Sequence, residues 1–215
     1  MQQEQVTEYW KKRVERKEKQ APTEFAKHCL NFLEDRKCTS LLDLGCGDGR
    51  DSIFFAKQGY EVTAVDVSPI ALQILQKKID EENIKNIRVM EQDILNIEFP
   101  ENSFDIIYAH LSLQYFLDKE TTEVFKNIHK ILKKGGFLFI KCKSTEDEDF
   151  GKGKMFETNV YVTRENYVRH FFDERYMREK LQGFTTLNIE KTTGTYEGLH
   201  GEKTSHFIEA VAAKM

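Results

Sequence analysis

The feature that most constrains the fold is a glycine-rich turn between an apolar run and a helix. Ser40–Leu44 is a short apolar segment that leads directly into Gly45, Gly47 and Gly49, with one residue between successive glycines. An apolar strand, a short turn and then an amphipathic helix, here from Arg50, form the repeating unit of parallel α/β sheets. Glycines at this spacing permit a tight turn and let the backbone approach a ligand closely.

The alternation of strand and helix continues along the chain and predicts an α/β fold. Strands are expected at 40–44, 60–65, 87–90, 104–109 and 137–142, and helices at 5–19, 22–35, 50–58 and 69–83. A further helix is expected with Asp118 as its cap and Lys133 and Lys134 in its last turn, before Gly135 ends it. Later in the chain the pattern predicts helices at 163–172 and 173–182, and strands at 184–190 and 205–213 that flank a Gly- and Thr-rich connection at 192–204.

Composition and charge limit the classes of partner. The 32 Lys and Arg residues nearly balance 36 Asp and Glu, for a formal net charge of −4, so a general nucleic-acid binder is disfavoured, although one RNA target read through a local basic patch stays open. The apolar runs are too short for a membrane span, and the first residues lack the basic and apolar regions of a signal peptide, which favours a cytoplasmic protein. The four cysteines show no Cys-x-x-Cys or zinc-ligand spacing, so no metal site is expected.

Two acidic residues follow strands at positions that favour an adenosine ligand. Asp66 closes the second predicted strand and Asp93 follows the third. A carboxylate has two oxygens that can accept the two hydroxyls of a ribose.

The spacing of the glycines indicates which adenosine ligand fits. The dinucleotide fingerprint G-x-G-x-x-G places a third glycine one residue later than Gly49 does. Asp48 and Asp51 also place negative charge beside the position of a pyrophosphate. A sulfonium amino acid attached to adenosine carries no phosphate and suits this turn better.

These motifs together resemble those of the class I S-adenosylmethionine-dependent methyltransferases. The resemblance rests on Asp43–Gly49, Val65–Pro69 and Gln92–Ile94, and it extends over about residues 41–142. Gly49–Ser52 and the small size are similar, more weakly, to the tellurite-resistance and thiopurine methyltransferase-like branch. The resemblance implies a Rossmann-like sheet of seven strands in the order 3-2-1-4-5-7-6, with strand seven antiparallel and helices on both faces.

The resemblance also implies an organisation for the whole chain. We expect one methyltransferase domain over 1–215, with an N-terminal helical cap at 1–38 and a cofactor-binding core at 39–143. A loop and helices on the substrate side occupy 144–183, where 144–160 is either a surface connection or a lid, and strands six and seven occupy 184–215.

Roles for individual residues follow from the resemblance alone. The backbone of Gly45, Cys46 and Gly47 would bound the methionine part of the cofactor, and Asp43 would orient its amino group. Asp66 would hold the ribose. The adenine would lie between Val67 and Ile94 with its amine on Asp93, and the carbonyl of Ala109 or His110 would meet the methionine ammonium.

Further candidates have structural alternatives of similar weight. Tyr9 with Trp10 and Arg13 would close over the cofactor, unless Trp10 packs on the sheet edge. Arg50 would pair with the cofactor carboxylate or an anionic acceptor, unless it forms a salt bridge with a neighbouring aspartate.

On the acceptor side, His110 is a candidate base or polar orienter, and Tyr115 is a candidate for the pocket wall, each against a purely structural role. The chain lacks the Asn/Asp-Pro-Pro-aromatic motif of nucleic-acid base amino-methylation. The leading hypothesis is therefore methyl transfer to a small-molecule acceptor by in-line displacement. The alternatives are a protein or tRNA methyltransferase, an NAD-dependent oxidoreductase, and a cofactor-binding module without catalysis. No membrane partner is expected, and the oligomeric state is left open.

Overall fold

The computed structural model describes residues 21–163, 166–198 and 201–215. The predicted helix at 5–19, with Tyr9, Trp10 and Arg13, lies outside them. The helices are α2 (Glu24–Leu33), α3 (Arg50–Lys57), α4 (Pro69–Glu82), α5 (Asp118–Ile131) and α6 (Glu174–Lys180), with 3₁₀ turns η1 (Ile94–Asn96) and η2 (Leu113–Tyr115). The strands are β1 (Ser40–Leu44), β2 (Glu61–Asp66), β3 (Ile87–Glu91), β4 (Phe104–His110), β5 (Leu132–Lys143), β6 (Lys154–Glu157), β7 (Val160–Val162), β8 (Val168–His170), β9 (Thr185–Gly198) and β10 (Gly201–Ala213).

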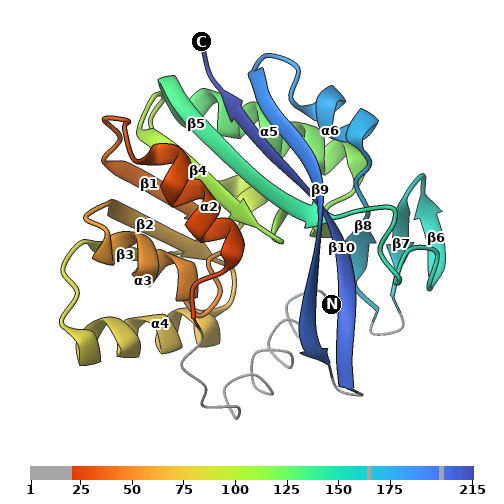
Figure 1. The fold of residues 1–215 in the computed structure, drawn as a ribbon, viewed down its shortest axis with the longest axis horizontal. Coiled ribbons are helices and arrows are strands. Elements are labelled where there is room, and N and C mark those ends of the chain that lie inside the picture. The colour runs from red at the N-terminus through yellow and green to blue at the C-terminus, as the bar shows by residue number, and fades with distance from the viewer. Residues whose placement is uncertain (1–20, 164–165, 199–200) are drawn as a thin grey trace.

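The central sheet has seven strands in the order β3-β2-β1-β4-β5-β10-β9 (Figure 1). Strands β1 to β5 are parallel, and β10 runs antiparallel to both β5 and β9. With β9 and β10 counted as strands six and seven, this is the predicted order 3-2-1-4-5-7-6, and the predicted antiparallel seventh strand is confirmed. The carboxyl ends of the five parallel strands all lie at one edge of the sheet, where ligands bind in open α/β folds.

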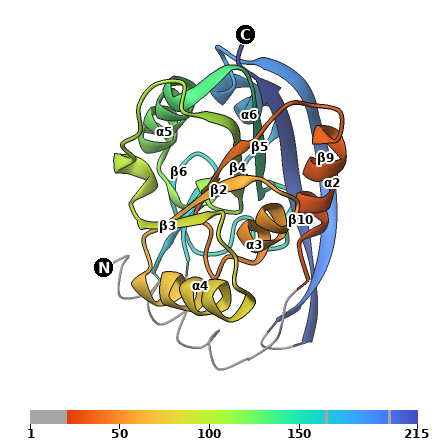
Figure 2. The same ribbon diagram turned by 90° about the vertical axis from the view of Figure 1, so that its left-hand side faces the viewer.

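Helices cover both faces of this sheet, as predicted (Figure 2). One apolar core joins the sheet to α2, α3 and α4, and Phe25, Phe55 and Leu75 are buried in it. The other core joins the opposite face to α5 and α6 through residues such as Phe125, Ile128 and Met177. Parallel strands buried on both faces need near-continuous apolar runs, which the sequence of β1 and β4 supplies.

The caps of α4 follow the sequence prediction, whereas those of α5 differ. Ser68 caps α4 by accepting the N–H of Ala71 at 3.3 Å, with Pro69 at the first helical position. The prediction that Asp118 caps α5 is wrong, because Leu117 is the cap residue and its N–H donates to the Glu120 carboxylate at 2.8 Å.

The predicted extension of α5 to Lys134 is also wrong. The helix ends at Ile131, and Lys133 belongs to β5, where its ammonium contacts the Asp105 carboxylate at 2.9 Å. The backbone N–H of Gly135 bonds to the carbonyl of Lys214. Pairing with neighbouring strands therefore replaces the last helical turn.

A separate three-stranded sheet, in the order β6-β7-β8, occupies the segment after β5. The helix predicted at 163–172 is wrong, since 168–170 form β8, which pairs with β7 through Val160 and His170. The β-branched residues Val160, Val162 and Val168 favour strands once a partner strand is available. The helix predicted at 173–182 is present as α6, which Asp173 caps.

The last two strands form a long hairpin that passes the end of β5. The connection predicted at 192–204 is wrong as a loop, because 192–198 and 201–204 continue β9 and β10, and Gly194 pairs with Ser205. Pairing of β10 with β5 begins only at Phe207, opposite Lys143. The hairpin therefore projects beyond the carboxyl edge of the sheet (Figure 1). Within the described ranges, no helix has the length and apolar character that crossing a membrane requires.

Candidate functional site

The glycine-rich turn after β1 has the strained backbone that only glycine adopts easily. Gly45, Gly47 and Gly49 all have positive φ angles, of 75°, 57° and 77°. A Cβ on Gly45 would lie 2.5 Å from the Cβ of Ser112, and one on Gly49 would collide with Leu75. The turn therefore needs glycine at these positions for both backbone and space.

Asp66 lies at the carboxyl end of β2, directly against this turn. Its carboxylate accepts the N–H of Gly47 at 2.8 Å and the N–H of Ser68 at 2.9 Å, one on each oxygen. The side chain is buried, and burial raises its pKa despite these hydrogen bonds. Each oxygen keeps a lone pair for a further donor.

Asp43 lies beneath the turn and is 3% exposed. Its carboxylate accepts the hydroxyl of Ser52 at 2.5 Å. Burial raises the pKa of Asp43 to about 8, with the Ser52 hydrogen bond opposing the shift.

The other aspartates near the turn are held by the protein. Asp51 accepts the Thr23 N–H at 2.9 Å and the Tyr108 hydroxyl at 2.7 Å. Its carboxylate, which the sequence placed beside the turn, therefore faces the start of α2 instead. Asp48 pairs with Lys78 at 2.9 Å. Arg50 lies 3.7 Å from Asp51, which is the salt bridge considered as its structural alternative.

The residues expected around an adenine gather after β2 and β3. Val67 follows Asp66 directly, and Ile94 is buried at the start of η1. Asp93 caps η1 by accepting the Leu95 N–H at 3.0 Å. The side-chain oxygen of Gln92 is buried and has no hydrogen-bond partner among the described residues, although the Gln92 N–H donates to the Asp66 carbonyl.

At the end of β4 the chain turns sharply beside the glycines. Ala109 is buried, and the half-buried His110 ring lies 6.0 Å from Phe25 between ring centroids. Leu111 then takes a φ of 57°, a left-handed conformation that costs a side-chain-bearing residue about 1–2 kcal/mol. The next residue, Ser112, is buried, and its hydroxyl has no hydrogen-bond partner among the described residues.

Tyr115 lies apart from the glycine turn, in η2, and is 38% exposed. Its ring contacts two residues that sequence reasoning missed, Tyr167 and Arg169. They were missed because 163–172 was predicted as a helix. In the extended chain, residues two positions apart, such as Tyr167 and Arg169, lie on the same side.

The structure thus brings Asp43, Cys46, Asp66 and Ser112 together around one turn. The Cys46 thiol lies 3.6 Å from the Gly47 carbonyl oxygen, and burial raises its pKa well above the usual value, so it is not poised as a nucleophile. Among the described residues, no group of three His, Cys, Asp or Glu side chains is arranged to hold a metal ion.

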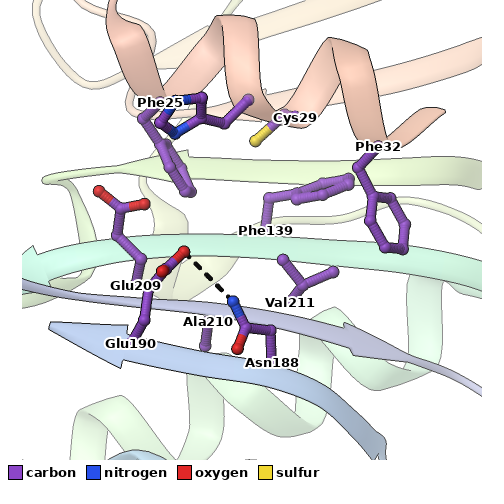
Figure 3. Close-up of a pocket in the computed structure, with 10 residues that line it drawn as sticks. Phe25, Cys29, Phe32, Phe139, Asn188, Glu190, Glu209, Ala210 and Val211 are labelled. Atoms are coloured by element: carbon purple, nitrogen blue, oxygen red, sulfur yellow. Dashed lines mark hydrogen bonds between the residues drawn. The ribbon is translucent and has the colours of Figure 1, made fainter. Parts of the chain in front are cut away.

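A pocket of about 150 Å³ lies elsewhere, between α2 and strands β5, β9 and β10 (Figure 3). None of the residues of the glycine turn lines it. Aromatic, histidine and cysteine side chains line it from α2 and β5, and acidic, amide and small apolar side chains line it from the hairpin: Phe25, His28, Cys29, Phe32, Phe139, Asn188, Glu190, Glu209, Ala210 and Val211.

Comparisons with known proteins agree with this geometry. Residues 41–136 match the family model described as a methyltransferase domain. YqeM of Bacillus subtilis, which is named as a methyltransferase without a stated substrate, is 34% identical over 134 residues, covering 61% of this chain and 52% of that protein. The demethylmenaquinone methyltransferase of Listeria welshimeri is 30% identical over 115 residues, covering 52% of this chain and 48% of the relative. The chain spans about half the length of these curated relatives.

Two solved structures share the fold. The 1,6-didemethyltoxoflavin-N1-methyltransferase of Burkholderia thailandensis, solved with S-adenosylhomocysteine, matches with a TM-score of 0.74 and 20% identity, covering 98% of this chain and 85% of that one. TehB of Haemophilus influenzae matches with a TM-score of 0.69 and 21% identity, covering 88% and 62%. Residues 41–136 thus match a methyltransferase domain, and the motifs and sheet order are those of the class I superfamily, whose cofactor is S-adenosylmethionine.

Proposed function

We propose that the protein transfers a methyl group from S-adenosylmethionine to a small-molecule acceptor by in-line displacement. The observation that carries the proposal is the Asp66 carboxylate, buried at the end of β2 and fixed by the Gly47 and Ser68 N–H groups. A carboxylate fixed in this way has its remaining lone pairs directed in advance toward the hydroxyls of a ribose.

The residues around the turn fit this cofactor. Buried polar atoms without partners call for a ligand or an ordered water, and two such atoms, on Gln92 and Ser112, border the turn. The space left by the missing side chain of Gly45 lets the backbone approach a bound group closely. The Asp66 carboxylate beside the turn suits a cofactor with a sulfonium and an ammonium group.

In the proposed mechanism the cofactor supplies a methyl group on a positively charged sulfur, which is already a good leaving group. The chain's main task is therefore to hold the acceptor in line with that methyl, and positioning alone can supply about 7–11 kcal/mol. His110 is proposed to orient the acceptor, because its ring is held near the Phe25 and Tyr108 rings at the end of β4. A base is needed only where the acceptor must lose a proton.

A small-molecule acceptor is favoured over a protein or tRNA. Two of the similar proteins are named for small-molecule acceptors, demethylmenaquinone and 1,6-didemethyltoxoflavin. The 144–183 segment holds a three-stranded sheet and one short helix, which leaves little chain for a separate macromolecule-binding domain.

Ligand binding and methyl transfer test the proposal in two steps. We expect S-adenosylhomocysteine to raise the melting temperature and NADH to leave it unchanged, whereas the reverse result would favour an oxidoreductase. Transfer of a tritiated methyl group is then measured across thiols, phenols, amines, carboxylates and oxyanions such as tellurite. Tight cofactor binding without transfer to any small acceptor, but with transfer to protein or tRNA, would contradict the choice of acceptor class.

A further inference from the structure

An arginine and two tyrosines from separate segments meet beside the carboxyl ends of β4 and β5. The Arg169 guanidinium carbon lies 4.9 Å from the ring centre of Tyr115 and 5.2 Å from that of Tyr167. Tyr115 belongs to η2, which follows the end of β4, and Arg169 belongs to β8. We call this group the Tyr115–Arg169–Tyr167 clamp.

Two observations place the clamp near the reacting end of the proposed site. A bridge between Ser144 and Phe172 joins the segment after β8 to the end of β5. Arg169 is also near enough to Cys142 in β5 for its positive charge to lower the pKa of that thiol. Burial has the larger effect and raises the same pKa. Tyr115 of the clamp also lies on the same short stretch after β4 as Ser112.

Arg169 keeps hydrogen-bond donors that the described protein does not use. One Nη2–H donates to the Tyr167 hydroxyl at 3.0 Å, and a guanidinium has five N–H donors. No carboxylate of the described residues forms an ion pair with it. Asp149, whose negative charge reaches Arg169, is paired with Lys203 at 2.5 Å and with Lys152 at 3.3 Å.

The chemistry of these groups defines the ligand that would complete the clamp. A permanently charged guanidinium among aromatic rings is costly to desolvate without an anion. Its planar fork matches the two oxygens of a carboxylate, with two parallel hydrogen bonds. The ring of Tyr115 is 38% exposed and offers a flat face to a conjugated molecule.

We propose that Arg169 binds the carboxylate of a planar, conjugated methyl acceptor, which stacks on Tyr115, and that Tyr167 holds the guanidinium in place. This inference rests on the proposed function and names the chemical class of its acceptor. Arg169 and Tyr115 then determine specificity, and Tyr167 is a positioning residue.

Two matched pairs of aromatic probes test the inference. 4-Hydroxybenzoate is compared with 4-hydroxybenzamide, and 4-mercaptobenzoate with 4-mercaptobenzamide, so that ring and nucleophile stay constant while the charge is removed. Their affinities are measured by calorimetry on the full chain saturated with S-adenosylhomocysteine. We expect each acid to bind at least tenfold more tightly than its amide, an order of magnitude typical of a charge-assisted bidentate pair.

Variants then assign this preference to the clamp. Arg169→Gln is expected to abolish the preference for acids, and Arg169→Lys to keep part of it. Tyr167→Phe keeps the ring but loses the hydroxyl, and is expected to weaken acid binding less than Arg169→Gln does. Tyr115→Ala removes a partly exposed ring and is expected to weaken the binding of acid and amide alike. This variant still tests the stacking of the acceptor on Tyr115 if Arg169→Gln does not fold. Arg178→Gln is the matched control, because Arg178 is exposed and pairs with Glu174 on α6.

Equal binding of acid and amide to the unaltered protein would overturn the inference. So would an acid preference that survives in a folded Arg169→Gln variant, or the absence of binding by every probe to protein that still binds S-adenosylhomocysteine. Failure of S-adenosylhomocysteine itself to bind is a different result, since it overturns the proposed function and the inference with it.

Discussion

The molecule holds its buried charges in two different ways. In the donor half, residues 40–110, the site carboxylates of Asp43 and Asp66 are held by a hydroxyl and by backbone N–H groups. In the acceptor half, residues 111–213, buried charges are held by side chains of opposite sign, as in Lys143 with Asp147 at 2.8 Å and Lys141 with Glu209 at 2.7 Å.

The difference matches the charge that each half is proposed to receive. The proposed cationic cofactor would bring positive charge to Asp66, whose carboxylate forms no ion pair among the described residues. The acceptor half instead presents a guanidinium, at Arg169, to an anion. Four predictions test this contrast, from the largest expected effect to the smallest.

Lys143→Met tests the ion-paired half. Lys143 is buried and also donates to the Ser205 hydroxyl at 2.5 Å, so its loss leaves the buried Asp147 without its cation. We expect a loss of about 3–5 kcal/mol in the free energy of unfolding, measured by urea denaturation. The matched change Lys126→Met breaks the exposed pair with Glu123 and should cost less than about 1 kcal/mol. Equal effects of the two substitutions would contradict the contrast.

Asp43→Asn tests the donor half through the pH dependence of stability, because Asp43 is held by a hydroxyl and, among the described residues, not by an ion pair. The folded carboxyl keeps its proton up to a pKa of about 8, whereas the unfolded one loses it near its ordinary pKa of 3.8. Between these values the native state binds more protons, so the Asp43 contribution lowers stability as pH rises, by up to about 1.4 kcal/mol per unit. Urea unfolding of both proteins at about pH 5 and pH 8 should show a steeper decline for the unaltered protein. Parallel pH profiles would show that Asp43 is not the cause.

Asp66→Ala tests ligand binding by the donor half. We expect the affinity for S-adenosylmethionine to fall by about 1.5–3 kcal/mol, the range for a hydrogen bond to a charged group, as measured by calorimetry. Asp80→Ala is the control, because Asp80 is an exposed residue of α4 whose carboxylate accepts a hydrogen bond only from the Gln76 side chain among described partners. An unchanged affinity in Asp66→Ala would remove Asp66 from the site.

Comparison of Gly45→Ala with Gly59→Ala separates the cost of a positive φ angle from the effect of a side chain that fills the space beside Ser112. Both glycines have positive φ, so each alanine should cost about 1–2 kcal/mol of stability, by urea unfolding. A Cβ at Gly59 meets nothing within 4 Å, whereas one at Gly45 meets Ser112. Only Gly45→Ala should therefore also weaken S-adenosylmethionine binding, and a similar loss in Gly59→Ala would refute the steric argument.

The donor half could be predicted from the sequence because its signals are local. The run into Gly45, the Ser68–Pro69 cap and Asp66 at the end of β2 each determine structure within a few residues. Asp43, Cys46 and Asp66 of the predicted cofactor residues therefore fall around one turn, although their contacts with a ligand stay a proposal. What the sequence did not reveal here was that Ser112 faces Gly45, since the two are brought together by the pairing of β1 with β4.

The acceptor half could be predicted only in part, because its structure depends on distant partners. The segment at 163–172 has no strand signal until β7 lies beside it, and 192–204 becomes a hairpin only because β10 pairs along the whole of β9. Lys133 leaves the helical pattern for a contact with Asp105 in another strand. Arg169 was missed for the same reason. One of its aromatic partners, Tyr115, is 54 residues away, and the other, Tyr167, lies within the segment that was predicted as a helix.

The contact between Gly45 and Ser112 has a consequence for the order of events. The backbone turns after β1 and after β4 touch with no side chain of Gly45 between them, so neither can shift without displacing the other. Tyr115 follows Ser112 by a single 3₁₀ turn. With the cofactor bound at the glycine turn as proposed, Ser112 would be held in place and Tyr115, three residues on, with it, so we expect the methyl donor to bind before the acceptor.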